Sequence, residues 1–88
     1  MYERGDYYAE VPPRFLDELD AHAKTGRPVC SFAEAVLEND LYKAVGHADS
    51  EAMAALKKIV AYVSCQLPPG CRGSAERVRN WRKEKRGD

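Results

Sequence analysis

The chain has 88 residues, of which 44% are hydrophobic and 32% are charged. This is enough for one small domain with a modest core, and it excludes a multidomain enzyme. The 14 basic and 14 acidic side chains cancel, so no overall field would attract a polyanion or an anionic bilayer. The charge is uneven, however. From Arg72 onward seven basic residues stand against three acidic ones, which makes the C-terminal end basic and the remainder acidic.

The sequence carries no sign of membrane insertion or export. No apolar run approaches the roughly 20 residues needed to cross a bilayer, and the polar, acidic start does not resemble a signal peptide. We therefore expect a cytoplasmic protein without a membrane partner. The odd number of cysteines, at spacings unlike those of a secreted disulfide framework, predicts reduced thiols at Cys30, Cys65 and Cys71.

The first elements are an arm and a helix. Residues 1–11 are rich in tyrosine and acid and have no sustained period, which predicts an extended arm containing Tyr2, Tyr7 and Tyr8. Pro12 and Pro13 then suit a first helical turn, and apolar residues follow at helical spacing. This helix should end near Lys24, because a glycine and then a proline follow it closely.

A second helix is predicted from Ser31 to about Ala48, opened by a capping box between Ser31 and Glu34. Its broad apolar stripe passes Asp40, which we expect to point inward. A capping or interhelical hydrogen bond is the simplest way to satisfy that carboxylate.

A third helix is predicted from the helix-starting run at 49–51 to about Leu67. Apolar residues at 53, 56, 60, 63 and 67 make this the strongest helical period in the chain. The stripe is widened by further apolar positions, and a chain this short has few residues to cover it. We therefore expect the protein to form a homo-oligomer.

Pro68-Pro69-Gly70 ends the third helix, and Ser74 should cap a short last one. Its inner face is expected to hold Ala75, Val78 and Trp81, and its outer face Arg77, Arg79, Arg82 and Lys83. Residues 84–88 should fray. No strand is indicated. The predicted fold is all-α, a single domain over residues 1–88 with three main helices and a short basic C-terminal helix.

Residues that could carry out chemistry are scattered. The cysteines and histidines match no zinc spacing, and no orienting group accompanies a Cys–His pair. Neither a P-loop nor a dinucleotide motif is present. We therefore expect no catalytic residue, no metal and no cofactor. The first two helices do not suit a helix-turn-helix, because Glu38 and Asp40 would face phosphates. DNA is not an expected partner.

Two segments suit an anionic ligand. Arg72-Gly73-Ser74 combines a cation with a glycine and a capped helix start, which attracts phosphate, but the same residues also make an ordinary N-cap. Lys24-Thr25-Gly26-Arg27 places two cations and a hydroxyl in a turn, with Tyr7 and Tyr8 just before the same helix. Aromatic faces beside cations stack bases and neutralise phosphates; alternatively, the tyrosines fold onto the core as a clasp.

Several of these motifs together resemble a known family. They are Gly26-x₅-Phe32, the run AVLENDL at 35–41, Ala48-Asp49, Ala55-Leu56, Pro68-x-x-Cys71-x-Gly73-Ser74 and Val78-x-x-Trp81. Over roughly residues 12–82 the chain resembles small phage proteins of the anti-CBASS cyclic-nucleotide sponge family. The resemblance implies an all-helical hexamer that works in the host bacterial cytoplasm. It would sequester the cyclic oligonucleotides that the host makes as alarm signals, without cleaving them.

The resemblance also implies site residues. Cyclic dinucleotides would lie between protomers, against an aromatic and a basic residue that fall on Tyr8 and Lys24, although Tyr7 and Arg27 compete for these roles. Cyclic trinucleotides would occupy a second pocket formed by Thr25, Arg72, Gly73 and Ser74. Arg72 departs from the family pattern, because relatives often have an aromatic residue there. An alternative function is a small helical protein–protein interaction module, of the inhibitor or antitoxin type, that uses the third helix.

Overall fold

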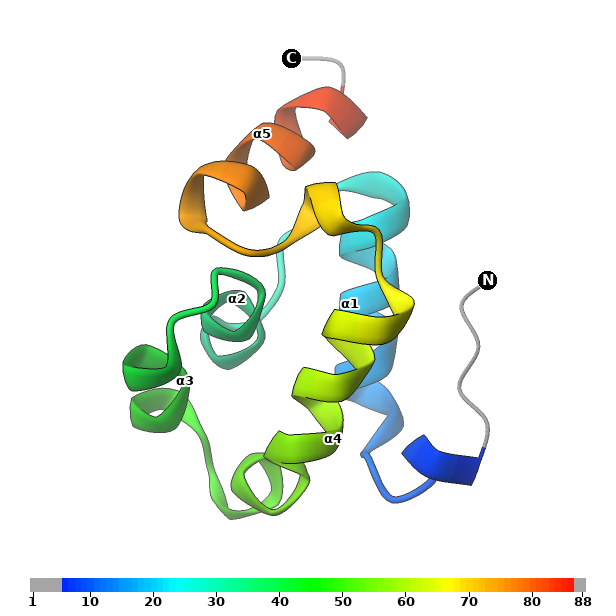
Figure 1. Ribbon diagram of the computed structural model, residues 1–88, viewed down its shortest axis with the longest axis vertical. Coiled ribbons are helices and arrows are strands. Elements are labelled where there is room, and N and C mark those ends of the chain that lie inside the picture. The colour runs from blue at the N-terminus through cyan, green and yellow to red at the C-terminus, as the bar shows by residue number, and fades with distance from the viewer. Residues whose placement is uncertain (1–5, 87–88) are drawn as a thin grey trace.

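The computed structural model describes residues 6–86, and this part of the chain is entirely helical, without strands (Figure 1). The elements in order are the 3₁₀ helix η1 (Asp6–Tyr8), α1 (Pro13–Thr25), α2 (Ser31–Leu37), α3 (Leu41–His47), α4 (Ser50–Gln66), the 3₁₀ helix η2 (Pro69–Cys71) and α5 (Ala75–Arg86). The all-α prediction is confirmed. Tyr2, with the rest of the arm up to residue 5, and the tail residues 87–88 lie outside the described part.

Helices α1 and α4 lie side by side and run in the same general direction (Figure 1). The predicted proline start of α1 is confirmed, and its last turn ends at Gly26, whose φ of 72° is left-handed and whose N–H donates to the His22 carbonyl. Helix α4 begins at the Asp49 cap, as its period predicted. Leu19 and Ile59 are fully buried at the centre of the domain, where the two helices contribute nearly half of the core residues.

The predicted second helix is in fact two helices, which corrects the prediction of three main helices. The chain turns after Leu37 because Asn39 adopts a left-handed φ of 62°, and Asp40 then caps α3 by accepting a hydrogen bond from the Lys43 N–H at 3.0 Å. The capping interpretation of Asp40 is therefore confirmed, but the cap starts a new helix.

The capping box at Ser31 and Glu34 was also wrong, although α2 begins at Ser31 as predicted. The N-cap residue is Cys30, and no side chain of the cap bonds to the helix start. Instead Glu18, on α1, accepts a hydrogen bond from the Cys30 N–H at 2.7 Å. Glu34 turns away and forms an ion pair with Arg82 at 3.0 Å.

Helix α5 crosses the C-terminal end of α1 (Figure 1). The Ser74 cap is confirmed, since its hydroxyl accepts a hydrogen bond from the Arg77 N–H at 3.1 Å. Val78 is buried as predicted, whereas Ala75 is exposed. Arg82 was assigned to the outer face, but it points inward to Glu34. The helix extends to Arg86, so residues 84–86 of the predicted tail are helical.

Candidate functional site

The two tyrosines of the N-terminal arm have different surroundings. Tyr8 is buried, and its ring stands edge-to-face with Tyr62 of α4, with centroids 5.0 Å apart. Tyr7 stands perpendicular to Tyr8 at the same centroid distance, yet 53% of it is exposed. The clasp interpretation is therefore correct for Tyr8. Of the pair, only Tyr7 offers substantial aromatic surface to a ligand in one protomer.

The Tyr8 clasp is anchored to α1 through a buried hydrogen bond. The Tyr62 hydroxyl donates to Asp20 Oδ1 at 2.6 Å, and both residues are buried. A hydrogen bond in the low-dielectric interior is electrostatically stronger than one at the surface. The stack of Tyr8 on Tyr62 is thus part of the fold.

The turn after α1 exposes its cations. Lys24 and Arg27 are exposed, while the Thr25 hydroxyl donates to the Ala21 carbonyl at 2.9 Å within the helix. Gly26 touches α5: a Cβ at this position would lie 3.0 Å from Cβ of Lys85. The turn that carries Lys24 and Arg27 therefore packs against α5 at Lys85, whose Nζ lies over the Trp81 ring, 4.7 Å from its centroid. We call Lys24, Arg27 and Lys85 the cationic corner.

The structure does not bring Tyr8 and Lys24 together within one protomer. They lie at opposite ends of α1, and the helix from Pro13 to Lys24 rises about 17 Å at roughly 1.5 Å per residue. Within one protomer, buried Tyr8 and exposed Lys24 therefore do not form a single site.

The predicted anion site at residues 72–74 is largely engaged in holding the fold. Arg72 donates to two carbonyls at the end of α4, to Ser64 O at 3.0 Å and to Leu67 O at 3.4 Å. The Gly73 N–H donates to the Leu37 carbonyl at 2.7 Å. The N-cap interpretation of this segment is therefore confirmed, with Ser74 as the capping residue.

Arg77 is the residue near this turn that sequence reasoning missed. Gly73 has a left-handed φ of 114°, and a Cβ there would lie 3.3 Å from Nη1 of Arg77. The side chain lies over the glycine, so the turn has a second arginine beside Arg72. Gly73 precedes the Ser74 cap and is not part of α5, so no helical spacing in the sequence signalled this contact.

Thr25 lies away from this turn. Its neighbour Gly26 packs against Arg82, which is about 10 Å along α5 from the first helical residue, Ala75. Thr25 is therefore separated from the Arg72–Ser74 segment by about the length of α5 between Ala75 and Arg82. The four residues predicted for the second pocket do not come together within one protomer.

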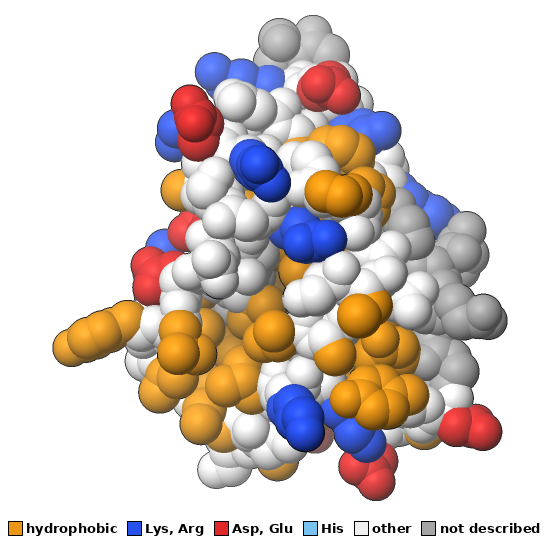
Figure 2. Space-filling model, viewed as in Figure 1, with side chains coloured by type: hydrophobic (Ala, Val, Ile, Leu, Met, Phe, Trp, Pro, Cys, Tyr) orange, Lys and Arg blue, Asp and Glu red, His pale blue; other side chains and the backbone are white. Residues whose placement is uncertain are grey.

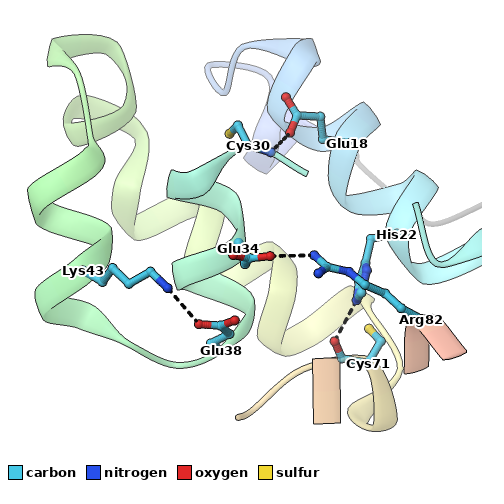
Figure 3. A network of polar contacts seen from close by, with 8 residues as sticks. All are labelled: Glu18, His22, Cys30, Glu34, Glu38, Lys43, Cys71 and Arg82. Atoms are coloured by element: carbon cyan, nitrogen blue, oxygen red, sulfur yellow. Dashed lines mark hydrogen bonds and ion pairs between the residues drawn. The ribbon is translucent and has the colours of Figure 1, made fainter. Parts of the chain in front are cut away.

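A polar network joins α1, α2 and α5 (Figure 3). His22 is fully buried and its Nε2 lies 3.0 Å from the Cys71 carbonyl oxygen. Burial lowers the pKa of His22; the hydrogen bond to that carbonyl opposes the shift, and the nearby Arg82 charge adds to it. Trp81 also holds α5 against α1, because its indole N–H donates to the carbonyls of His22 and Ala23, each at 3.1 Å.

The thiols are poorly placed for nucleophilic chemistry. Partial burial raises the pKa of Cys30, and the Glu18 carboxylate acts in the same direction. Burial raises the pKa of Cys71 to about 11. Both groups are therefore thiols at neutral pH, and the thiolate is the nucleophilic form. All three cysteines are free, as predicted.

Among residues 6–86 no group of three or more His, Cys, Asp or Glu side chains is placed to hold a metal ion. None of the helices in the same range has the length and apolar character needed to cross a membrane. No family model, curated protein or solved structure matches the chain.

Apolar side chains are exposed on α3 and on the adjoining face of α4. We call this set the α3–α4 apolar surface; its residues are Leu41, Tyr42, Val45, Met53 and Val60. Figure 2 shows hydrophobic side chains gathered over α3 and the neighbouring part of α4, at the lower left of the view. Tyr42 is 93% exposed and Leu41 68%. Contiguous apolar area of this kind on a small domain indicates a contact surface.

Proposed function

We propose that this protein binds cyclic di- and trinucleotides and sequesters them without cleavage, as a phage anti-defence protein in the host bacterial cytoplasm. The resemblance to the anti-CBASS sponge family suggests the function. The cationic corner of Lys24, Arg27 and Lys85 is the observation that carries it, because exposed cations beside a turn that packs closely on α5 suit phosphodiester groups.

The separation of Tyr8 from Lys24 supports a ligand held between protomers. A cyclic dinucleotide that contacts the cationic corner of one copy can reach the arm of another, with Tyr7 or Tyr8 as the aromatic partner. Such a site is complete only in the oligomer, so binding and self-association should be coupled.

The second pocket, for cyclic trinucleotides, is proposed at Thr25, Arg72, Gly73 and Ser74. Arg72 has donors beyond the two that bond to the α4 carbonyls. The start of α5 leaves the N–H groups of Ala75 and Glu76 without an intrahelical acceptor. Phosphates at this turn would be contacted by those groups, with Thr25 contributed by another protomer.

The α3–α4 apolar surface is the proposed self-association surface, in an assembly that the family resemblance makes a hexamer. Beside it run two adjoining cavities of about 200 and 210 Å³, which share Val36, Asn39 and Val60. The projecting Leu41 and Tyr42 of one copy can pack against the α2–α4 groove of the next. Burial of apolar side chains then stabilises the assembly.

The proposed function is tested by titration calorimetry of the protein with a panel of cyclic di- and trinucleotides, followed by chromatography of the ligand recovered after denaturation. We expect tight binding and intact ligand. Lys24→Ala should weaken dinucleotide binding by about 1.5–3 kcal/mol, the usual contribution of a hydrogen bond to a charged group. The control Lys83→Ala removes an exposed cation of α5 that does not belong to the cationic corner, and it should leave the affinity unchanged. Cleaved ligand would make the protein an enzyme.

A protein–protein interaction module is the second candidate, favoured by the near-complete exposure of Tyr42. In that case the α3–α4 apolar surface binds a different protein. The purified chain would then be monomeric at high concentration, and no member of the nucleotide panel would give heat.

A further inference from the structure

The N-terminal arm and α4 border a groove of about 360 Å³ that the sequence did not indicate. Its apolar lining is Pro12, Ala54 and Ala55, and two lysines, Lys57 and Lys58, line it as well. An apolar surface with a few polar groups is the usual composition of a small-molecule site.

Tyr7 lies at the edge of this groove. Lys58 Nζ, which belongs to the groove, is 5.3 Å from the Tyr7 ring centroid. Tyr7 is not itself a lining residue, and its ring is positioned by the perpendicular contact with buried Tyr8 and by Lys58 Nζ, which lies over the ring. About half of Tyr7 remains exposed. An aromatic side chain that is both positioned and exposed can stack on a nucleobase of any sequence.

The charged side chains of the groove are arranged so that an anion could bind to its lysines. Its two carboxylates have partners: Glu51 pairs with Arg14, and Glu10 pairs with Lys58 at 3.1 Å. Lys57 has no ion-pair partner among the described residues. The Glu10 side chain is 84% exposed, so it can move from Lys58 into water when a phosphate approaches.

We propose that this groove binds one nucleotide unit of a cyclic oligonucleotide, with the base stacked on Tyr7 and a phosphate between Lys57 and Lys58. The inference rests on the proposed function and assigns the stacking role to Tyr7, while Tyr8 holds Tyr7 in place. It also adds α4 to the ligand-binding elements.

The test is calorimetry of the full chain with 3′,3′-cyclic GMP-AMP. Tyr7→Ala should weaken binding roughly 5- to 150-fold, the range measured for loss of one base–aromatic stack. Tyr7→Phe keeps the ring and should bind like the wild type. Lys57→Gln and Lys58→Gln should each weaken binding and reduce its dependence on salt, whereas Lys83→Gln, with the same change in net charge, should not. Circular dichroism of each variant should match that of the wild type.

The outcomes separate this inference from the proposed function. If the wild type binds and Lys24→Ala weakens binding, but Tyr7→Ala binds like the wild type, the groove is not the site and the proposed function stands. Loss of affinity in Tyr7→Ala but not in Tyr7→Phe, together with weaker binding in Lys57→Gln and Lys58→Gln, supports the groove; loss in Tyr7→Ala with unchanged binding in both lysine variants overturns it. If the wild type itself gives no heat, the proposed function fails, and the nucleotide assignment of the groove fails with it.

Discussion

His22 couples the stability of the domain to pH. Burial holds its folded-state pKa below the ordinary value of 6.5, so at and below pH 6.5 the unfolded chain binds a proton more readily than the folded one. Stability contributed by neutral His22 is therefore complete above pH 6.5 and is lost as the pH falls toward the folded-state pKa. Protonation would also place a second cation near Arg82.

We expect urea denaturation to show a falling free energy of unfolding below pH 6.5. The exposed His47 provides the matched control: His47→Gln should preserve the pH dependence, and His22→Gln should flatten it at a lower overall stability. An unchanged pH profile in His22→Gln would mean that other groups are responsible.

Two glycines should respond in opposite ways to alanine. Gly26 has a left-handed φ, and a Cβ would lie 3.1 Å from Cα of Arg82. Gly26→Ala should therefore destabilise the fold by about 1–3 kcal/mol, from backbone strain and overpacking. Gly46 is in a helix with open space around it, so Gly46→Ala should stabilise by about 0.5–1 kcal/mol. Thermal unfolding of both variants measures the contrast, and a loss of stability at Gly46 would contradict it.

At the scale of the elements, the break between α2 and α3 depends on one carboxylate. Asp40 caps α3, a helix of only seven residues. Removing the cap with Asp40→Ala should cost about 0.5–2 kcal/mol, whereas Asp40→Asn or Asp40→Ser retains a capping oxygen and should lose less. Hydrogen exchange at the amides of α3 should accelerate in the alanine variant. Equal stability of all three variants would show that tertiary packing alone holds α3.

The helices that were predicted correctly have strong local signals. The three- and four-residue apolar spacing defined α4, and Gly26 with the following proline defined the end of α1. The α2–α3 break has a weaker signal, the pair Asn39-Asp40, which suits a left-handed residue followed by an N-cap. The apolar period continues across this pair and obscures it. The capping box failed since Glu34 has a partner, Arg82, that lies 48 positions further along the chain. Long-range contacts of this kind override local propensity.

The sequence indicated which residue types form the candidate site, but not how buried each one is or what it contacts. The tyrosines and cations were identified from their chemistry and the family resemblance. Sequence could not distinguish buried Tyr8 from exposed Tyr7, because burial depends on Tyr62 across the domain. It also could not reveal that Arg72 bonds to the α4 carbonyls, or that Lys57 and Lys58 border a groove with the arm.

At the scale of the whole molecule, the α3–α4 apolar surface should control self-association. Tyr42→Lys places a charge on an almost fully exposed position, so it should leave the monomer fold intact and oppose burial in an interface. We expect sedimentation velocity to show a smaller species than the wild type. The control Lys83→Ala should sediment like the wild type. If Tyr42→Lys assembles normally, self-association uses another face.

The three cysteines differ in burial, so their reactivity can report local opening of the fold. Cys30 and Cys65 are exposed, whereas the Cys71 Sγ donates to the Pro68 carbonyl at 3.2 Å inside the η2 turn. A maleimide added to the native protein should therefore react with the exposed Cys65 and Cys30, the second being slowed by its raised pKa. It should react with Cys71 only when the α4–α5 connection opens. The rate of the Cys71 reaction reports how often the α4–α5 connection opens, and no cysteine has to be introduced to measure it.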